Sequence, residues 1–337
     1  MKVLEVQKGF GLDHLVFSDR PQPRPGSGEV LLRMKAASLN YRDLLTVQGF
    51  YSPKQPLPLI PGSDGIGEVV ETGDGVSRVK KGDRVATTFF QGWISGEPTI
   101  EKAATSLGGP LDGVLTEYKL VKEDGVVHVP EHLSDEQAAT LPCAALTAWN
   151  ALAIQGRVKA GQTVLVQGTG GVALFSLQFA KLMGARVILI SSSDEKLERA
   201  RTMGMDHGIN YRQTPRWGKA VKELTGGIGV DHIIELGGAG TMQESLQAVR
   251  LGGEISLIGV LAGPAKELNI TPILMRNIRV QGILVGNREY FESMNRAIAH
   301  HRLQPVVDRI FPFEETRKAF ELMAGAGHFG KICISIG

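Results

Sequence analysis

Cysteine is scarce in this chain, which has two in 337 residues, Cys143 and Cys333. Two cysteines exclude the disulfide framework that stabilises many small secreted domains, and they suit a reducing compartment. No apolar run approaches the roughly 20 residues that a helix needs to cross a bilayer. The first 11 residues also lack the apolar core of a secretory signal. We therefore expect a cytoplasmic protein.

An excess of charge of either sign is also absent, since the formal net charge is +2 at pH 7. The sequence therefore gives no electrostatic basis for binding nucleic acid or an anionic membrane surface. Hydrophobic residues make up 42% and charged residues 21%, which is typical of soluble globular enzymes. The length allows two domains of ordinary size. Glycine is abundant, with 42 residues, and suits a chain with many tight turns.

The most informative segment is residues 161–193. Its short β-branched run at 163–166 predicts a strand buried on both faces. A G-x-G-x-x-A loop follows, then helical spacing at 174–183 and a second apolar strand at 186–190. In such a βαβ unit the glycines permit a tight turn and the close approach of a pyrophosphate, so the loop predicts a dinucleotide site; a turn without a ligand is the alternative. The residues expected to contact the dinucleotide are Gly168, Thr169, Gly170, Gly171 and Val172.

The second strand of this unit ends without the acidic residue that binds the ribose of NAD. Ser191 and Ser192 stand there instead, followed by Ser193, and Lys196 lies a few residues beyond. Hydroxyl and ammonium groups favour a 2′-phosphate, which a carboxylate would repel. We therefore expect NADPH rather than NADH. Capping of the helix that begins near Asp194 is an alternative role, and it would account for one of the serines.

The rest of the sequence predicts a β-rich region followed by a region of alternating strands and helices. Residues 1–127 consist mostly of short strands separated by Gly, Pro and Asp turns. A capping box at Ser134 predicts the start of a helix. From residue 163 onward, strands and helices alternate as in an α/β fold, with six strands in all. The last segment, 331–336, alternates like a strand and is expected to return to the first domain.

Several motifs outside the glycine loop resemble those of the medium-chain dehydrogenase/reductases. They are PGSDG at 61–65, GDGV at 73–76, KGDRV at 81–85 and LPCAALTAW at 141–149. The resemblance covers essentially the whole chain. It implies an α/β protein with a GroES-like, β-rich catalytic domain (1–127 and 288–337) and a doubly wound Rossmann NADP-binding domain (128–287), with the active site between them.

Within this family the chain resembles the zinc-independent branch, quinone oxidoreductase-like and close to the enoyl reductases. Zinc-dependent alcohol dehydrogenases carry Cys where this chain has Asn40 and His where it has Ser63, and Asn and Ser cannot replace these zinc ligands. Cys143 matches the third ligand, and we interpret it as a small buried hydrophobic residue. Residues 89–111 contain none of the four Cys of a structural-zinc lobe. The resemblance therefore implies no metal.

The resemblance also implies roles for individual residues. Tyr51 matches the tyrosine that serves as the acid in zinc-free enoyl reductases, with lining of the cleft as the alternative. Asn40 and Thr147 are expected beside the nicotinamide ribose or ring, and Tyr211 beside the 2′-phosphate. Phe89, Phe90 and Trp93 are candidates for an apolar lid or for core packing. The remaining expected cofactor contacts, mostly through the main chain, are Gly237, Gly259, Val260, Leu284, Val285 and Asn287.

Without a metal, hydride addition to a conjugated acceptor needs less help than reduction of an isolated carbonyl, because the developing charge spreads to a distant oxygen. The sequence therefore predicts an NADPH-dependent, zinc-independent oxidoreductase that transfers hydride to quinones or α,β-unsaturated carbonyls. A medium-chain alcohol dehydrogenase and a non-catalytic NADPH-binding sensor are the alternatives. The resemblance also implies a homodimer that pairs the edge strand near 280–285 across subunits, which would cover an otherwise exposed apolar edge.

Overall fold

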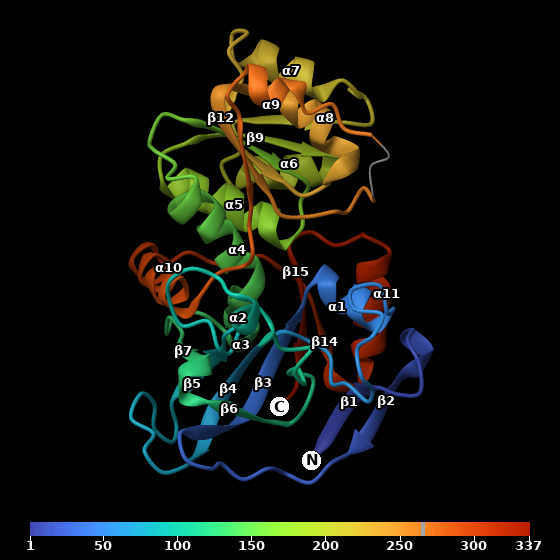
Figure 1. Ribbon diagram of the computed structural model, residues 1–337, viewed down its shortest axis with the longest axis vertical. Coiled ribbons are helices and arrows are strands. Elements are labelled where there is room, and N and C mark those ends of the chain that lie inside the picture. The colour runs from blue at the N-terminus through green and yellow to red at the C-terminus, as the bar shows by residue number, and fades with distance from the viewer. Residues whose placement is uncertain (264–266) are drawn as a thin grey trace. The chain divides into compact units, whose positions relative to one another are not determined.

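The computed structural model describes residues 1–263 and 267–337, and the chain divides into two compact units (Figure 1). Unit 1 comprises Met1–Leu146 and Gly286–Gly337, and unit 2 comprises Thr147–Val285. The first boundary thus lies at 146, whereas the sequence suggested 127. The reason is that helix α3 (Asp135–Ala139) packs on strands β3 (Glu29–Leu39) and β4 (Asp64–Thr72) of the β-rich unit.

Unit 1 is built on a mainly antiparallel sheet around the long strand β3. In the described residues its order is β14-β15-β3-β4-β5-β7, and β6 also pairs with β3. Strand β15 pairs antiparallel with β3, which confirms that the C-terminal strand returns to the first domain. The other strands of this sheet are β5 (Arg84–Thr87), β6 (Tyr118–Lys122), β7 (Val126–His128), β14 (Val307–Pro312) and β15 (Lys331–Ser335).

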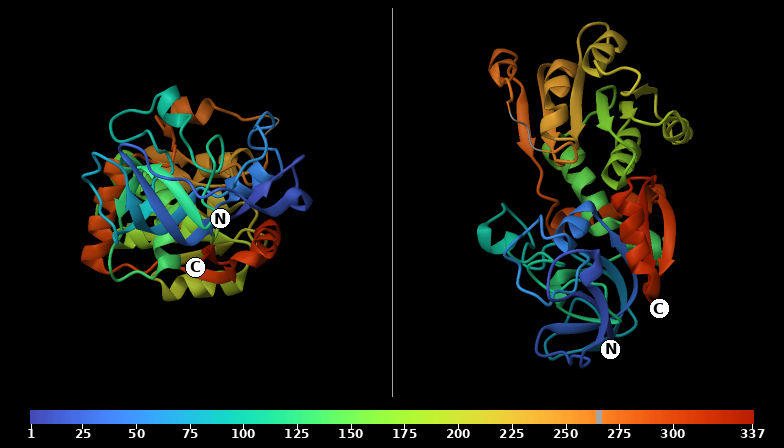
Figure 2. Two further views of the ribbon diagram at one scale, coloured as in Figure 1. Left: turned by 90° about the horizontal axis from the view of Figure 1, so that it is seen from below. Right: turned by 90° about the vertical axis from the view of Figure 1, so that its right-hand side faces the viewer.

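The core of unit 1 lies on this sheet, because β3 is apolar along most of its length and is buried on both faces. Helix α11 (Thr316–Ala324) packs beside β14 and β15 (Figure 2). Its Phe320 is fully buried. The remaining elements are β1 (Lys2–Val6), β2 (Leu15–Asp19), α1 (Tyr41–Val47), α2 (Ile100–Ala103), α10 (Arg288–His301), the 3-10 turns η1 (Leu12–His14), η2 (Glu123–Gly125) and η5 (Phe313–Glu315), and the π-helical turn η3 (Leu141–Ala145).

Unit 2 contains a parallel sheet whose six strands, in the described part of the unit, have the order β10-β9-β8-β11-β12-β13. All the strand pairs are parallel, and the order runs outward in both directions from β8. This confirms the expected doubly wound fold. The strands are β8 (Thr163–Gln167), β9 (Arg186–Ser191), β10 (His207–Asn210), β11 (Val230–Glu235), β12 (Val249–Leu257) and β13 (Arg279–Gly282).

Helices cover the sheet of unit 2, and α7 lies beside α8 (Figure 1). Strand β8 is central, and its Val164, Leu165 and Val166 have no exposed surface. The carboxyl ends of parallel strands meet at one edge, which is where a doubly wound sheet binds its ligand. The helices are α4 (Leu146–Trp149), continued by the π-helical turn η4 (Asn150–Gln155), then α5 (Gly171–Leu182), α6 (Asp194–Thr202), α7 (Trp217–Leu224), α8 (Ala239–Ala248) and α9 (Thr271–Met275).

In residues 1–263 and 267–337, no helix is both long enough and apolar enough to span a bilayer.

Candidate functional site

The glycine loop of unit 2 joins β8 to α5 at the carboxyl edge of the sheet. Gly168 has φ +79°, a conformation that side chains other than glycine rarely adopt. A Cβ atom built on Gly168 or Gly170 would meet no heavy atom within 4 Å, whereas Ala173 is fully buried against the sheet. The two glycines therefore border open space at a helix N-terminus. This arrangement fits a pyrophosphate better than it fits a packed turn without a ligand.

A buried polar network ties this loop to the loop after β11, and the sequence analysis missed it. Gln167 Nε2 donates to Glu235 Oε2 at 2.7 Å, and Gln167 Oε1 accepts from the N–H groups of Leu236 and Gly237, each at 3.0 Å. Glu235 Oε1 accepts from the N–H groups of Gly237 and Gly238 at 3.0 and 2.9 Å. Glu235 thus fixes the main chain at Gly237. The available signal was a polar residue at the end of each of two buried strands.

The ends of β9 and β10 bring Ser191 and Tyr211 together, since the Tyr211 N–H donates to the Ser191 carbonyl at 3.0 Å. Ser193 caps α6, because its Oγ accepts from the Lys196 N–H at 3.3 Å. Capping therefore accounts for one of the three serines. Ser191 is buried and Ser192 is partly exposed.

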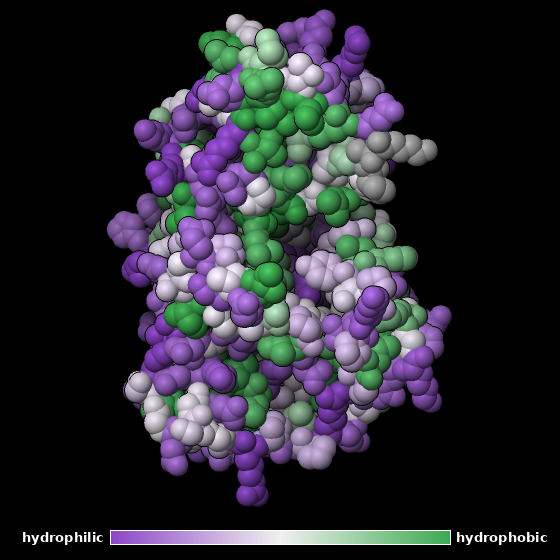
Figure 3. Space-filling view, viewed as in Figure 1, coloured by the Kyte–Doolittle hydropathy of each residue, from purple (hydrophilic) through white to green (hydrophobic). Residues whose placement is uncertain are grey.

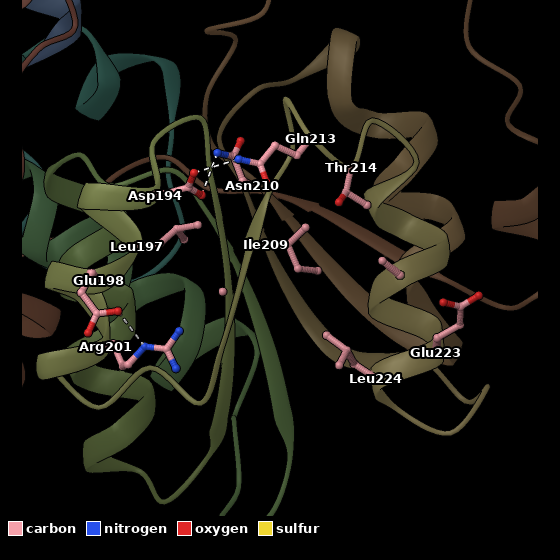
Figure 4. A pocket seen from close by; sticks show the side chains of 12 residues that line it. Asp194, Leu197, Glu198, Arg201, Ile209, Asn210, Gln213, Thr214, Glu223 and Leu224 are labelled. Atoms are coloured by element: carbon pink, nitrogen blue, oxygen red, sulfur yellow. Dashed lines mark hydrogen bonds and ion pairs between the residues drawn. The ribbon is translucent and has the colours of Figure 1, made fainter.

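Asp194 is the first acidic residue after these serines along the chain. It accepts hydrogen bonds from Asn210 Nδ2 at 2.9 Å and Gln213 Nε2 at 2.8 Å (Figure 4). Both partners lie at or after the end of β10, so this carboxylate is engaged by amides.

The cavity in Figure 4 has a volume of about 670 Å³ and lies along the edge strand β10. Its lining includes Glu198 and Arg201 of α6 and Glu223 of α7. No residue of the glycine loop lines it. We therefore do not assign it to the dinucleotide.

The other expected cofactor residues lie in different settings. Val260 and Leu284 are exposed, and Gly259 donates its N–H to the Glu235 carbonyl at 3.2 Å. Val285 has φ +39°, and its carbonyl accepts from Asn150 Nδ2 at 2.9 Å. Asn287 belongs to unit 1, where its Oδ1 caps α10 by accepting from the Tyr290 N–H at 2.8 Å. Thr147 is buried in α4 of unit 2.

Unit 1 holds a buried polar cluster that consists of Asn40, Ser63, Asp64, Cys143 and Lys331. Asn40 immediately precedes α1, and its N–H donates to Asp43 Oδ2 at 2.8 Å, which supports the loop. Lys331 Nζ donates to Asn40 Oδ1 at 2.5 Å. Asn40 Nδ2 donates to Ser63 Oγ at 3.2 Å, and Ser63 Oγ donates to Asp64 Oδ1 at 2.8 Å. Asp64 Oδ2 accepts from the Cys143 N–H at 3.0 Å.

Burial shifts the titration of the acidic groups in this region. It raises the pKa of Asp43 to about 6, opposed by the Arg42 guanidinium, and it raises the pKa of Asp64, opposed by the Lys331 ammonium. Burial also raises the pKa of the Cys143 thiol, so this group is protonated at neutral pH. The Asp43 and Asp64 carboxyl groups thus interact with the Arg42 and Lys331 cations in a buried environment.

The donor set of the polar cluster does not fit a catalytic zinc ion. Asn40 and Ser63 are hydrogen-bonded to each other, and neither supplies the thiolate, imidazole or carboxylate that a zinc ion requires as a ligand. Within residues 1–263 and 267–337, no group of three or more His, Cys, Asp and Glu side chains is arranged to hold a metal ion.

Tyr51 lies at the surface of unit 1 with 52% of its area exposed. The Arg42 guanidinium stacks on its ring at 4.8 Å from the centroid and on the Phe89 ring at 5.0 Å. Arg42 is itself fixed by hydrogen bonds to the Leu107 and Gly109 carbonyls at 2.7 and 2.9 Å. The buried Arg42 guanidinium therefore holds the ring of the exposed Tyr51 side chain.

The three aromatic residues considered for a lid, Phe89, Phe90 and Trp93, are all buried in unit 1. Phe90 packs against Phe89 at a centroid distance of 4.7 Å and against Trp93 at 5.7 Å. Of the two roles considered for them, this burial favours packing in the core of unit 1 over a lid.

Comparisons with known proteins place both units in one family. The GroES-like domain of alcohol dehydrogenases matches residues 26–131, and the zinc-binding dehydrogenase domain matches residues 171–300. A zinc-type alcohol dehydrogenase-like protein of Schizosaccharomyces pombe is 42% identical over 97% of this chain and 96% of its own length. An acryloyl-coenzyme A reductase of Metallosphaera sedula is 32% identical over 93% of this chain and 94% of its own.

Two solved structures have the same fold over the full length of both chains. An NAD-dependent alcohol dehydrogenase is 32% identical with a TM-score of 0.91, covering 100% of each chain. A mycobacterial protein in complex with NADPH is 26% identical with a TM-score of 0.84, again over 100% of each chain. On these similarities, the chain belongs to the medium-chain, zinc-type alcohol dehydrogenase-like family and is an oxidoreductase with a GroES-like and a Rossmann-like domain.

Proposed function

We propose that this protein is an NADPH-dependent, zinc-independent reductase of quinones or α,β-unsaturated carbonyls. The observation that carries the proposal is the hydrogen-bonded chain Lys331-Asn40-Ser63-Asp64. Its members Asn40 and Ser63 stand where the zinc-dependent members of the family carry ligands. A site without a Lewis acid favours conjugated acceptors, because their developing charge is spread over several atoms.

The chemistry divides between the two units. NADPH, when bound to the glycine loop of unit 2, supplies the hydride. The protein has to align cofactor and acceptor and stabilise an enolate or hydroquinone anion. Tyr51 is the proposed proton donor to an enolate, and its ring is already fixed by Arg42. For a quinone, solvent can supply the protons.

The preference for NADPH rests on the end of β9. Ser191 and Ser192 stand where NAD-binding relatives of this fold carry an acid, and Asp194 is engaged by Asn210 and Gln213. Lys196 and Tyr211 complete the proposed 2′-phosphate site. Among similar proteins, one is described as NAD-dependent and one as NADPH-bound. The cofactor therefore has to be tested directly.

The test is NADPH oxidation by metal-free protein against a panel of an ortho-quinone, para-benzoquinone, a short enone and an enoyl-CoA thioester. Turnover is expected to survive a chelator, to be unaffected by added Zn²⁺, and to be faster with NADPH than with NADH. NADP-linked alcohol oxidation that requires Zn²⁺ would instead support an alcohol dehydrogenase, as several relatives are named. Tight NADPH binding without turnover on any acceptor would support a sensor.

A homodimer through the edge of the unit 2 sheet is part of the proposal. Strand β13 pairs only with β12, so its other edge is open in the described chain. Figure 3 shows apolar side chains gathered over the preceding helix α9, where Ile270, Leu274 and Met275 are exposed. Analytical ultracentrifugation at micromolar concentration is expected to show a dimer, and a monomer alone would contradict this part of the proposal.

A further inference from the structure

The hydrogen bonds between Gln167 and Glu235 lie where the strand order of the unit 2 sheet reverses. Gln167 is the last residue of β8, Glu235 is the last residue of β11, and these two strands are neighbours. From β8 the chain continues to β9 on one side, and from β11 it continues to β12 on the other. A doubly wound sheet binds its ligand in the crevice at such a switch point. The two side chains therefore connect the loops that border this crevice, the glycine loop and the segment 236–238.

Glu235 is a carboxylate without exposed surface that amide and hydroxyl groups hold. Its Oε2 accepts from Gln167 Nε2 at 2.7 Å and from Ser245 Oγ. Its Oε1 accepts from the Gly238 N–H at 2.9 Å and from Thr241 Oγ1 at 2.5 Å. A change of one atom in this buried group leaves a donor or an acceptor without its partner, which is costly.

The segment 236–238 is in turn packed against the loop after β12. The Gly259 N–H donates to the Glu235 carbonyl at 3.2 Å, and the Ala262 N–H donates to the Gly237 carbonyl at 2.9 Å. A Cβ atom built on Gly238 would lie 2.8 Å from the Gly259 carbonyl oxygen. Gly237 and Gly259 are both expected cofactor contacts, so a displacement of this segment affects both.

The Glu235 carboxylate also lies at the N-terminus of α8. Gly238 is the N-cap residue of this helix and Thr241 belongs to its first turn, and both donate to Glu235 Oε1. An anion is favourable at a helix N-terminus, and α8 thus has one from its own chain. The N-terminus of α5, at Gly170, borders open space instead. This difference favours α5 over α8 for a phosphate group.

We propose that Gln167 and Glu235 are positioning residues, which hold the two loops at the switch point at the separation that the adenosine and pyrophosphate part of the cofactor requires. The inference rests on the proposed function, because it takes the glycine loop as the cofactor site, and it involves unit 2 alone. Both side chains act through the main chain, Gln167 on the adjacent Gly168 and Glu235 on Gly237.

The test exchanges the two side chains, which have the same length and differ in one terminal group. Gln167→Glu places a carboxylate against the Glu235 carboxylate. Glu235→Gln places an NH₂ group either against the Gln167 NH₂ or against the N–H groups of Gly237 and Gly238. Each single variant therefore breaks the connection. The double variant Gln167→Glu/Glu235→Gln reverses donor and acceptor, so the connection can form again.

Equilibrium binding is measured for NADPH and for 2′,5′-ADP, which shares the adenosine half. For each single variant we expect Kd to rise about tenfold for both ligands, as loss of a hydrogen bond to a charged group predicts. The double variant is expected to restore most of the affinity. In steady-state kinetics of the single variants, the KM for the cofactor should rise while the KM for the acceptor stays the same.

His232→Gln is the matched control, since His232 is another buried polar residue of β11, with its Nε2 2.9 Å from Ser256 Oγ. At pH 7 it is expected to leave both Kd values unchanged. If the single variants do not fold, Thr241→Val replaces them. It removes one donor to Glu235 Oε1 and keeps the shape of the side chain, and it is expected to raise both Kd values.

A folded double variant that binds as weakly as the two single losses combined would overturn the inference. Unchanged affinity in both single variants, or in Thr241→Val where it replaces them, would also overturn it, as would an equal loss in His232→Gln. If the wild type prefers NADH, then NADH and ADP serve as the ligands. Failure of the wild type to reduce any acceptor would reject the proposed reductase, whereas the binding comparison would still report on Gln167 and Glu235.

Discussion

At the scale of single residues, Tyr51 offers a direct test of the proton donor. Removing its hydroxyl in Tyr51→Phe leaves the ring on Arg42, so we expect the fold and NADPH binding to be unchanged. If the phenol protonates the enolate, kcat for a short enone should fall by about 10²-fold, the lower range for general acid catalysis, while quinone reduction stays the same. Steady-state kinetics on both acceptors measure this. An unchanged enone rate would reduce Tyr51 to a residue that lines the site.

Ser192 and Ser193 form a matched pair for the choice of cofactor. Ser192→Asp places a carboxylate beside the proposed 2′-phosphate site, and we expect the KM for NADPH to rise about tenfold or more while the KM for NADH changes little. Ser193→Ala removes the cap of α6 and should cost about 1 kcal/mol of stability without changing the ratio of the two KM values. If the two variants change that ratio equally, the end of β9 does not select the cofactor.

At the scale of elements, the loop between β8 and α5 allows a test of whether Gly170 is needed for the backbone conformation or for binding the cofactor. Gly170 has φ −81°, so Gly170→Ala is compatible with the backbone, and its Cβ would enter open space. We expect the melting temperature to stay the same and the Kd for NADPH to rise more than tenfold, because the methyl group occupies the place of the pyrophosphate. Thermal denaturation and fluorescence titration check the two outcomes. Normal NADPH binding by this variant would mean that the open space is not the cofactor site.

Many elements of unit 2 could be predicted because central strands such as β8 and β9 are short apolar runs and helices such as α7 have a 3.6-residue period. The region from 134 to 155 was harder. Its capping box at Ser134 was confirmed, and beyond α3 the chain forms the π-helical turn η3, the short helix α4 and the π-helical turn η4. Local spacing does not reveal which unit such a segment joins. Packing of α3 on β3 and β4 decides that it begins in unit 1.

At the scale of the whole molecule, stability should respond to pH through a buried histidine. His232 of β11 is 2% exposed, and its Nε2 lies 2.9 Å from Ser256 Oγ. Burial, with a smaller effect of Arg279, lowers its pKa to about 4 from 6.5. Between those values the unfolded chain binds a proton that the folded chain does not, so the free energy of unfolding falls as the pH falls.

His232→Gln removes this dependence and keeps a partner for Ser256. The stability of the wild type relative to this variant should decrease by about 2 kcal/mol from pH 7 to pH 4.5. Urea unfolding at a series of pH values measures the difference. Asp43 acts in the opposite direction, because its pKa of about 6 lets the folded chain retain a proton in part of the same range. A difference between wild type and variant that does not change with pH would contradict the role of His232.

The candidate site shows where sequence reasoning stops. The glycine loop is contiguous, so its spacing could be recognised directly. The partners of Asn40 were not accessible in this way, because Lys331 lies 291 residues further along the chain. Glu235 is likewise 68 residues from Gln167. A buried ion or amide needs a partner, but the sequence does not say which one the fold supplies.

The sequence by itself determined the family resemblance, the doubly wound sheet and the place of the dinucleotide loop. These depend on local periodicity and on the backbone freedom of glycine, which a short segment carries wherever it lies. Only the tertiary structure decided that Asn40, Ser63, Asp64 and Lys331 form one directed hydrogen-bonded chain, and that Gly168 and Gly170 border open space. Hydrogen-bond direction and free volume arise from residues brought together by folding, so no single segment encodes them.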